Sequence, residues 1–553
     1  MKDYTKKQKI LIILGVSLFI LIGSGLTYAG LMWATSNPIN IGLTSGCFEI
    51  NYTPGGAINN ANVEVMDEST LISNNKFTIT EGIALTYANI GIKSTCSIEG
   101  YGSLYLNVTN LSNAFSTGSS KGSLKYAILN NTSSSTNLTV AGLKGQSFDI
   151  IKTGTITSTG TVNILTKQLS NTSQNKYLIV FYIDGSKIGN DVVGASFAGN
   201  ISADAHQGEL DFAKETLNYL KSLNSTITLA NDTPDFTKVS GNNGGKGDGT
   251  KGIYKAEDDL GISYYFRGAV DNNYVKFANF YWRIIRINGD GSIRMIYAGT
   301  SAHANGESET NSYISKTAYN SSYNDNTYVG YMTGSTGATT YANTHSNTNN
   351  STIKVVIDTW YKTNIEDKGY SAYVADAIYC NDRSIANDSA TNTMLTKVNS
   401  SWTNTGFGYG KNVTAYGGFK RNWVEHTPSL KCPNNNDKFT KSSTLGNGKL
   451  TYPVALITSD EIAYAGGLSY DFNTRSYIRN TDFYLHTPSY YYWTLTPWAF
   501  AGGNSVVDDW LALGRFGGFN VDGSDCAARA AVSLLSDAIS GGNGTINNPF
   551  TVG

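Results

Sequence analysis

Residues 490–500 read YYYWTLTPWAF, and residues 525–538 read DCAARAAVSLLSDA. The first stretch is aromatic, apolar and rich in residues with a high β-propensity, which predicts a buried strand. Pro497 is expected to end regular pairing, and the glycines that follow predict turns. Residues 510–513 and 530–534 are two further predicted strands, and they flank a long polar segment that is rich in turn residues. We therefore expect the end of the chain to form a β-core with large surface loops.

Two parts of the C-terminal sequence resemble a known group of domains. Residues 492–497, YWTLTP, and residues 528–534, ARAAVSL, are similar to the core of C-type-lectin-like or formylglycine-generating-enzyme-like domains of bacterial surface proteins. The family pattern has a proline where Ala530 stands. Residues 282–291, WRIIRINGDG, resemble the first strand and hairpin of the same group. The resemblance implies an α+β lectin-like domain over residues 253–553.

Length and composition restrict the class of protein. A chain of 553 residues is expected to hold two or three domains. With 41 basic and 42 acidic side chains the net charge is -1, so a nucleic-acid partner is not expected. Charged residues make up 15% of the chain, against about 25% in a typical soluble domain. Amides and hydroxyls replace them, as in many extracellular proteins with a mainly β structure.

The N-terminus predicts export. Four lysines, the last of them Lys9, precede an uncharged run over residues 10–33. Positive residues stay on the cytoplasmic side, so the rest of the chain is expected on the extracellular face of the membrane. Residues 1–35 fit either a cleaved signal peptide, with small residues at 27–29, or a retained transmembrane anchor. Both alternatives stay open.

Residues 36–207 predict a β-sandwich. Short alternating segments with turn residues between them give the predicted strands: 47–52, 76–80, 102–108, 124–129, 160–165 and 177–183. Cys47 and Cys96 are expected to form a disulfide in an oxidising compartment.

The same region resembles the camelysin and biofilm-fibre-subunit group of secreted Gram-positive proteins. The similarity rests on four stretches: CFEI at 47–50, FTITE at 77–81, YLIVFYID at 177–184 and FAGNISADA at 197–205. It implies an exported β-sandwich. The peptidase activity sometimes given to that group is not expected here, because the sequence contains no HExxH.

Residues 208–252 are predicted to connect the two domains. Phe212, Thr216, Tyr219 and Leu223 recur at helical spacing, which predicts a short amphipathic helix. Residues 240–252, SGNNGGKGDGTKG, have the composition of a flexible linker.

The C-terminal domain is predicted to begin with strands at 262–266, 274–277, 280–287 and 292–298, with a tight turn at residues 288–291. Ser351 is the expected N-cap of an amphipathic helix. Residues 458–461, TSDE, form a capping box for a second helix that is expected to stop at Gly466. The chain as a whole is therefore predicted to be mainly β.

Three cysteines remain in this domain. A disulfide between Cys380 and Cys432 closes a loop of about 50 residues and is expected to contribute about 3 to 4 kcal/mol. Cys526 is the odd one, expected either to be buried or to act as a thiol-exchange partner. A formylglycine-generating oxidase needs a pair of reactive cysteines, which the sequence near Cys526 lacks. No metal site or cofactor is predicted.

The segment after Pro497 carries the candidate ligand-binding residues. Aromatic rings beside carboxylates suit contacts with carbohydrate or protein, and recognition residues concentrate on loops. Trp510 and Phe519 are expected in the hydrophobic core and are therefore not among the candidates. The candidates are Trp498, Phe500, Asp508, Asp509, Arg515, Phe516, Asp522 and Asp525.

The sequence favours an exported, membrane-anchored bacterial cell-surface protein that presents a lectin-like module to an extracellular glycan or protein. The main alternative is a structural or accessory subunit of an extracellular fibre or matrix. A formylglycine-generating-like oxidase is a third reading. Because fold resemblance supports architecture more than activity, the ligand stays open.

Overall fold

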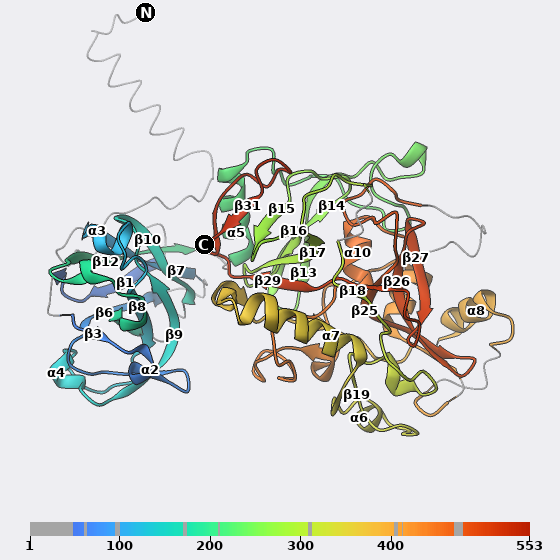
Figure 1. Cartoon of the computed structure of the whole chain (residues 1–553), viewed down its shortest axis with the longest axis horizontal. Helices are drawn as coiled ribbons and strands as arrows, with labels where there is room; N and C mark the ends of the chain where they lie inside the picture. Colours follow the sequence, from blue (N-terminus) through green and yellow to red (C-terminus); the bar gives the residue numbers. More distant parts are fainter. Residues whose placement is uncertain are drawn as a thin grey trace, which may run out of the picture. The chain divides into compact units, whose positions relative to one another are not determined.

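The computed structural model describes residues 48–59, 63–94, 100–169, 174–207, 211–307, 312–386, 388–402, 408–411, 413–468 and 479–553. The protein is mainly β, as predicted. It divides into two compact units, Met1–Leu210 and Asp211–Gly553 (Figure 1). Residues 1–35 and the Cys47–Cys96 pair lie outside the described residues. Within the described ranges, no helix is both long and apolar enough to cross a membrane.

The first unit contains two sheets. Along the first sheet the strands are β1 (Phe48–Pro54), β6 (Ala84–Ser94), β11 (Asn175–Asp184), β8 (Leu124–Asn130), β9 (Ser147–Thr155), β5 (Lys76–Thr78) and β4 (Ile72–Ser73), with β3 (Val65–Met66) beside β11. The second sheet runs β10 (Gly160–Leu169), β7 (Gly100–Leu111), β12 (Phe197–Gln207) and β2 (Ile58–Asn59). Short helices are α2 (Glu68–Leu71), α3 (Asn113–Ser116) and α4 (Val140–Leu143).

One hydrophobic core draws on both sheets of this unit. Ile179 and Phe181 of β11 pack with Leu104 and Leu106 of β7. Alternate residues of β11 point to the opposite face and form a second cluster, because successive side chains of a strand lie on opposite sides of the sheet. All six predicted strands occur; the long strands β6, β9 and β12 and the two-residue strands β2, β3 and β4 were not predicted.

The second unit is built around a nine-stranded sheet. Its order is β21 (Val374–Ala375), β29 (Ala531–Leu534), β17 (Ile293–Gly299), β16 (Phe280–Ile287), β15 (Tyr274–Phe277), β31 (Phe550–Val552) and β30 (Ile539–Gly541), with β14 (Gly261–Arg267) paired to β16 and β13 (Gly252–Asp258) to β14. The predicted turn at residues 288–291 joins β16 to β17, with Gly291 at a φ of 85°. In Figure 1 the late strand β29 lies beside the much earlier β17.

A six-stranded sheet holds the stretch at residues 490–500. Its order is β18 (Ser315–Lys316), β28 (Ala527–Ala528), β25 (Tyr492–Ala501), β26 (Asn504–Leu511) and β27 (Arg515–Asn520), with β23 (Thr414–Ala415) beside β25. Tyr492 and Trp493 are fully buried, as predicted. Regular pairing stops at Pro497, as predicted, because the register with β26 shifts on both sides of it, although β25 continues to Ala501. Such an irregularity accommodates a residue that has no backbone N–H.

The remaining elements of the second unit are short. Two-stranded ladders join β19 (Met332–Thr333) to β20 (Asn349–Asn350) and β22 (Tyr379–Cys380) to β24 (Lys438–Phe439). The helices are α5 (Phe212–Leu223), α6 (Tyr341–Thr344), α7 (Thr352–Tyr361), α8 (Ser389–Val398), α9 (Gly417–Phe419) and α10 (Ser459–Ala465). Ser351 caps α7, and the capping box of Thr458 and Glu461 starts α10, which ends at Gly466 as predicted.

Residues 240–252 do not form the predicted flexible tether. They belong to the second unit, where the guanidinium group of Arg267 holds them in place. Nη2 of Arg267 lies 2.9 Å from Oδ2 of Asp248, and its Nε donates to Oγ1 of Thr250 at 2.6 Å. Arg267 is fully buried, so its charge requires these partners. The glycine content of residues 240–252 predicts a flexible segment, but composition does not reveal that Arg267, outside the segment, fixes it.

Candidate functional site

The predicted ligand-binding residues lie mainly on strands, which corrects the expectation of surface loops. Trp498 and Phe500 are on β25, Asp508 and Asp509 on β26, and Arg515 and Phe516 on β27. All except the half-buried Arg515 are buried. Only Asp522 and Asp525, after β27, are exposed. Gly502, Gly503 and Gly514 occupy tight turns with positive φ. The polar segment after Pro497 therefore folds into two hairpins instead of one long loop.

The adjacent carboxylates of β26 differ in their partners. Oδ1 of Asp508 accepts a hydrogen bond from Nε1 of Trp423 at 3.0 Å, and Oδ2 accepts one from Oγ of Ser459 at 2.7 Å. Neither carboxylate oxygen of Asp509 has a hydrogen-bond partner among the described residues. Burial raises the pKa of Asp509 to about 7, although the charge of Arg515 lowers it in part.

Asp509→Asn is expected to change how stability depends on pH. The unfolded carboxyl has a pKa of about 3.9, so between about pH 4 and 7 the unfolded chain releases a proton that folded Asp509 keeps. The wild type therefore loses stability over this window, and the variant lacks that loss. Denaturant unfolding at pH 4, 5.5 and 7 measures the free energy of unfolding of both proteins. Between pH 4 and pH 7 the variant is expected to gain on the order of 3 kcal/mol in this free energy relative to wild type. Asp522→Asn, on an exposed residue, is the control, and parallel curves for all three proteins would contradict the assignment.

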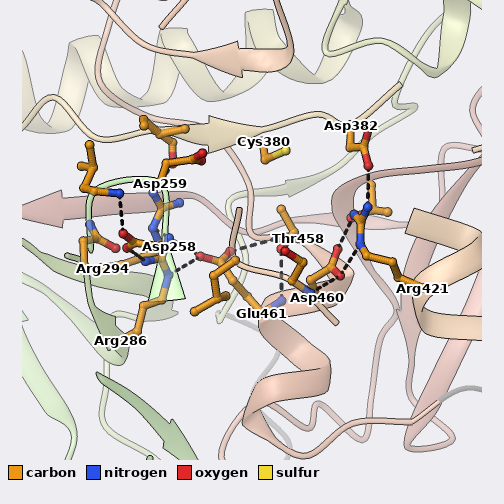
Figure 2. Close-up of a pocket in the computed structure, with 16 residues that line it drawn as sticks. Asp258, Asp259, Arg286, Arg294, Cys380, Asp382, Arg421, Thr458, Asp460 and Glu461 are labelled. Carbon is orange, nitrogen blue, oxygen red and sulfur yellow. Dashed lines mark hydrogen bonds and ion pairs between the residues drawn. The ribbon is translucent and has the colours of Figure 1, made fainter. Parts of the chain in front are cut away.

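A charged pocket lies in the second unit, where the nine-stranded sheet meets the start of α10 (Figure 2). We call it the Glu461 pocket. Its lining residues are Asp258, Asp259, Leu260, Arg286, Asn288, Arg294, Ile378, Cys380, Asp382, Arg421, Ser429, Leu430, Thr458, Asp460, Glu461 and Thr496. Five carboxylates and three guanidinium groups give this lining a formal excess of two negative charges.

The register of the sheet places the polar side chains on one face. Arg286 of β16 pairs directly with Arg294 of β17, which in turn pairs with Ser533 of β29. Asn288 lies two residues beyond Arg286 and therefore on the same side of the sheet. Its amide donates to the hydroxyl oxygens of Ser292 at 2.8 Å and Ser533 at 3.2 Å. A polar stripe thus crosses an otherwise apolar sheet.

Glu461 holds this stripe from the first turn of α10. Its Oε1 lies 3.0 Å from Nε of Arg286 and 3.4 Å from Nε of Arg294, while Oε2 accepts from the backbone N–H of Thr458 at 3.0 Å. Burial by itself raises the pKa of Glu461, but Arg294 and Arg286 outweigh it, so the pKa is lower than usual. Arg286 also contacts Oδ2 of Asp258 at 2.6 Å. The Glu461 carboxylate therefore stays ionised beside the two guanidinium groups.

Arg421 forms a second cluster on the other side of the start of α10 (Figure 2). It lies on the short helical segment Lys420–Glu425. Its Nε and Nη2 donate to the two oxygens of Asp460 at 2.9 and 3.0 Å, and its Nη1 donates to Oδ2 of Asp382 at 2.6 Å. Burial lowers the pKa of Arg421, but the two carboxylates reverse this and raise it. A bidentate pair of this kind fixes the orientation of both side chains.

The disulfide Cys380–Cys432 lies at the rim of the pocket and confirms the predicted pairing. Cys380 is itself a lining residue. The backbone N–H of Cys432 donates to Oδ2 of Asp259 at 3.0 Å, and Lys438 lies 2.9 Å from the other oxygen of Asp259. Asp259, Leu260 and Ser429 are only partly buried, so this rim reaches the solvent.

Two buried polar atoms of the pocket have no hydrogen-bond partner among the described residues. They are Oδ1 of Asn288, an acceptor, and Nε of Arg294, a donor that is ion-paired with Oε1 of Glu461 at 3.4 Å. Both residues are almost completely buried, at 3% and 2% exposure. The cavity has a volume of about 30 Å³, which is room for about one or two water-sized groups. A small group that donates a hydrogen bond to Oδ1 of Asn288 can therefore be accommodated in the pocket.

Guanidinium or ammonium groups hold all five carboxylates of the pocket. In the described part of the chain, no group of three or more His, Cys, Asp or Glu side chains is arranged to hold a metal ion. Cys526 is fully buried, and burial together with the charge of Asp509 raises the pKa of its thiol well above the usual value. A thiol in this state is a poor nucleophile.

The pocket residues were not predicted as a site, although two signals were present. Arg286 stands within an apolar strand, and a buried arginine requires acidic partners. Glu461 was recognised only as part of a capping box. Their pairing joins residues 175 positions apart, which local patterns do not reveal.

Comparison with known proteins leaves the family open. No protein-family model matches the chain, and no curated protein is similar to it.

Proposed function

We propose that this protein is an exported, membrane-anchored bacterial cell-surface protein whose second unit is a lectin-like, ligand-binding module, with the first unit a β-sandwich that presents it. Two sheets around one core support the sandwich assignment. The disulfide supports export, because such bonds persist in oxidising compartments. The proposed location is the extracellular face of the membrane.

The observation that carries the binding role is the Glu461 pocket. Its polar groups are fixed by ion pairs and by a capping box, so they are already oriented before a ligand arrives. A site of this kind loses little conformational entropy on binding. Oδ1 of Asn288, which has no partner among the described residues, leaves a hydrogen bond for a ligand to complete. The proposed partner is an extracellular glycan or protein.

Two measurements test the proposal. Protease treatment of intact bacteria that express the full-length protein is expected to release fragments of both units, while a cytoplasmic marker stays intact. The released or purified protein is expected to bind at least one member of a panel of glycans and extracellular proteins. Protection of both units on intact cells, or the absence of any ligand in the panel, would contradict the proposal.

A second candidate function is that of a subunit of an extracellular fibre. Strand β10 favours it, because this ten-residue strand lies at the edge of the second sheet and pairs with β7 alone. An open edge can accept a strand from another copy. Electron microscopy separates the two functions: discrete particles favour the ligand-binding module, and filaments favour the fibre.

A further inference from the structure

We propose that His345 holds the surface segment 334–350 closed at neutral pH and that acid opens this segment. The inference goes beyond the proposed ligand-binding function, because it uses none of the residues that line the Glu461 pocket. It depends on three observations: the burial of the imidazole ring, the charges around the ring and the exposure of the segment that carries it.

The imidazole ring of His345 lies in a cage of aromatic side chains. His345 is the C-cap of α6 and is fully buried. Its ring centroid lies 5.4 Å from that of Tyr341, 5.1 Å from that of Tyr409 and 6.5 Å from that of Tyr416. Neither ring nitrogen has a hydrogen-bond partner among the described residues. The closed segment therefore requires a neutral ring, because an imidazolium there would be a buried charge without a partner.

The nearest charged pair also disfavours an imidazolium in the cage. Burial lowers the pKa of His345 well below its usual value, and the charge of Arg383 lowers it further. Arg383 already has a partner, since its Nη2 lies 2.6 Å from Oδ1 of Asp437. Burial raises the pKa of Asp437, although Arg383 opposes this in part. Acid therefore favours the closed state through Asp437, and only His345 of these three residues drives opening.

The other titratable groups around the cage are three tyrosine hydroxyls and one carboxylate. Burial raises the pKa of all three hydroxyls, so they stay neutral. The carboxylate is Asp325, whose charge reaches Tyr416. Its Oδ2 accepts a hydrogen bond from the backbone N–H of Gly337 at 2.6 Å. Asp325 thus holds the first part of the segment, and a change at His345 leaves this contact in place.

The segment that carries His345 lies at the surface of the second unit, where α6 and β19 are found at one end in Figure 1. Its exposed residues include Ala342, Asn343, Thr348, Asn349 and Asn350. Nδ2 of Asn436 donates to the backbone oxygen of His345 at 2.7 Å, and Nη1 of Arg383 donates to Oδ1 of Asn347 at 2.9 Å. These bonds lie next to the ring, so they break when the ring leaves the cage. Exposed segments of this kind open locally at a lower free-energy cost than global unfolding.

Linkage gives the sign and the size of the effect. In the open segment the ring meets water and has its usual pKa of about 6.5. The open state then binds the proton more tightly than the closed state. The closed state is therefore fully favoured above about pH 6.5 and loses stability as the pH falls below that value. The equilibrium constant for opening is expected to rise about tenfold between pH 7.5 and 5.5.

Hydrogen exchange followed by mass spectrometry tests this on the unmodified full-length protein. Division by the intrinsic exchange rate at each pH gives protection factors that report opening alone. The amides of Ser335, Thr344, His345 and Thr348 donate to backbone oxygens within or next to the segment and are the reporters. Their protection is expected to fall about tenfold between pH 7.5 and 5.5. Peptides from β16 are the internal reference and are expected to keep their protection.

His345→Phe tests whether this histidine is the titrating group. The variant keeps an aromatic ring in the cage and removes the ionisable nitrogens, so protection of the segment is expected to be the same at both pH values. His303→Phe, the same exchange at a half-buried histidine, is the control and is expected to keep the tenfold change of wild type. Near-ultraviolet circular dichroism and thermal midpoints establish that each variant is folded.

Each outcome either supports or overturns the inference. An equal loss of protection in wild type and in folded His345→Phe overturns it, because the acid-sensitive group then lies elsewhere. If His345→Phe does not fold, the wild-type profile decides alone. A tenfold loss confined to residues 334–350 supports the inference, and no loss, or a loss spread over the second unit, overturns it. The ligand panel is measured at neutral pH, so its result is independent of this one.

Discussion

Glu461→Gln is expected to lower the free energy of unfolding of the second unit by about 3 to 5 kcal/mol. The change removes the negative charge that Arg286 and Arg294 share at the start of α10. Arg286 keeps Asp258, but Arg294 is left as a buried cation facing a neutral amide. Breaking one partner of a buried ion pair is much more costly than never having had the pair. Chemical denaturation of the full-length protein measures the loss.

The control for this prediction is Glu257→Gln. Its carboxylate lies 2.6 Å from Nζ of Lys431, a distance as short as any in the pocket, but its side chain is 68% exposed. Exposed ion pairs contribute little because water and salt screen them, so no measurable change is expected. Equal effects of the two variants would show that burial does not decide the strength of the pocket's ion pairs.

Acid is expected to weaken the same interaction in the wild type. The folded-state pKa of Glu461 is lower than its unfolded value of about 4.3. Its contribution to the free energy of unfolding is therefore complete above about pH 4.3 and is lost as the pH falls below that value. Glu461→Gln carries no such group. The difference between the two proteins should therefore shrink as the pH falls below about 4.

Removing the disulfide is the second large effect that we expect. In Cys380→Ser/Cys432→Ser the unfolded chain regains the freedom of a loop that spans a sequence separation of 52. Loop-closure entropy for a loop of that length gives a loss of about 4 kcal/mol. Guanidinium denaturation with and without a reductant measures it. Reductant is expected to bring the wild type to the stability of the double variant and to leave the variant unchanged.

A wild type that keeps its unfolding midpoint when both cysteines are reduced would contradict this expectation. The pocket provides an additional readout. Because Cys380 lines it and the backbone of Cys432 orients Asp259, the double variant is also expected to bind any ligand found in the panel of glycans and extracellular proteins more weakly. Weakened binding with little loss of stability would place the role of the disulfide at the rim alone.

Elements that depend on near neighbours were predictable. The capping box of α10 joins residues three positions apart, and the turn from β16 to β17 follows from Gly291. The buried strand at Tyr492 and Trp493 was predicted from its aromatic and β-prone composition. In each case the residues that stabilise the structure are adjacent along the chain, so the sequence displays them together.

The candidate ligand residues were predicted less well. Asp508 and Asp509 stand among glycines, whose local preference is for turns, and so they were expected on loops. The burial of Asp508 depends on Trp423 and Ser459, which lie 85 and 49 positions away and supply its hydrogen bonds. Local composition describes the turns on either side of the strands but not the partners that allow a carboxylate to enter the core.

From the sequence alone follow the mainly β class, the positions of the main strands and caps, and the pairing of Cys380 with Cys432, because these depend on periodicity, local hydrogen bonds and the small number of cysteines. The Glu461 pocket was decided by the tertiary structure. Its charges come from β13, β16, β17, α10 and the segments around Asp382 and Arg421, and they attract one another only after the sheet and helix have packed. Electrostatic complementarity acts through space over a few ångströms, whereas Arg286 and Glu461, for example, are separated by 175 positions along the chain.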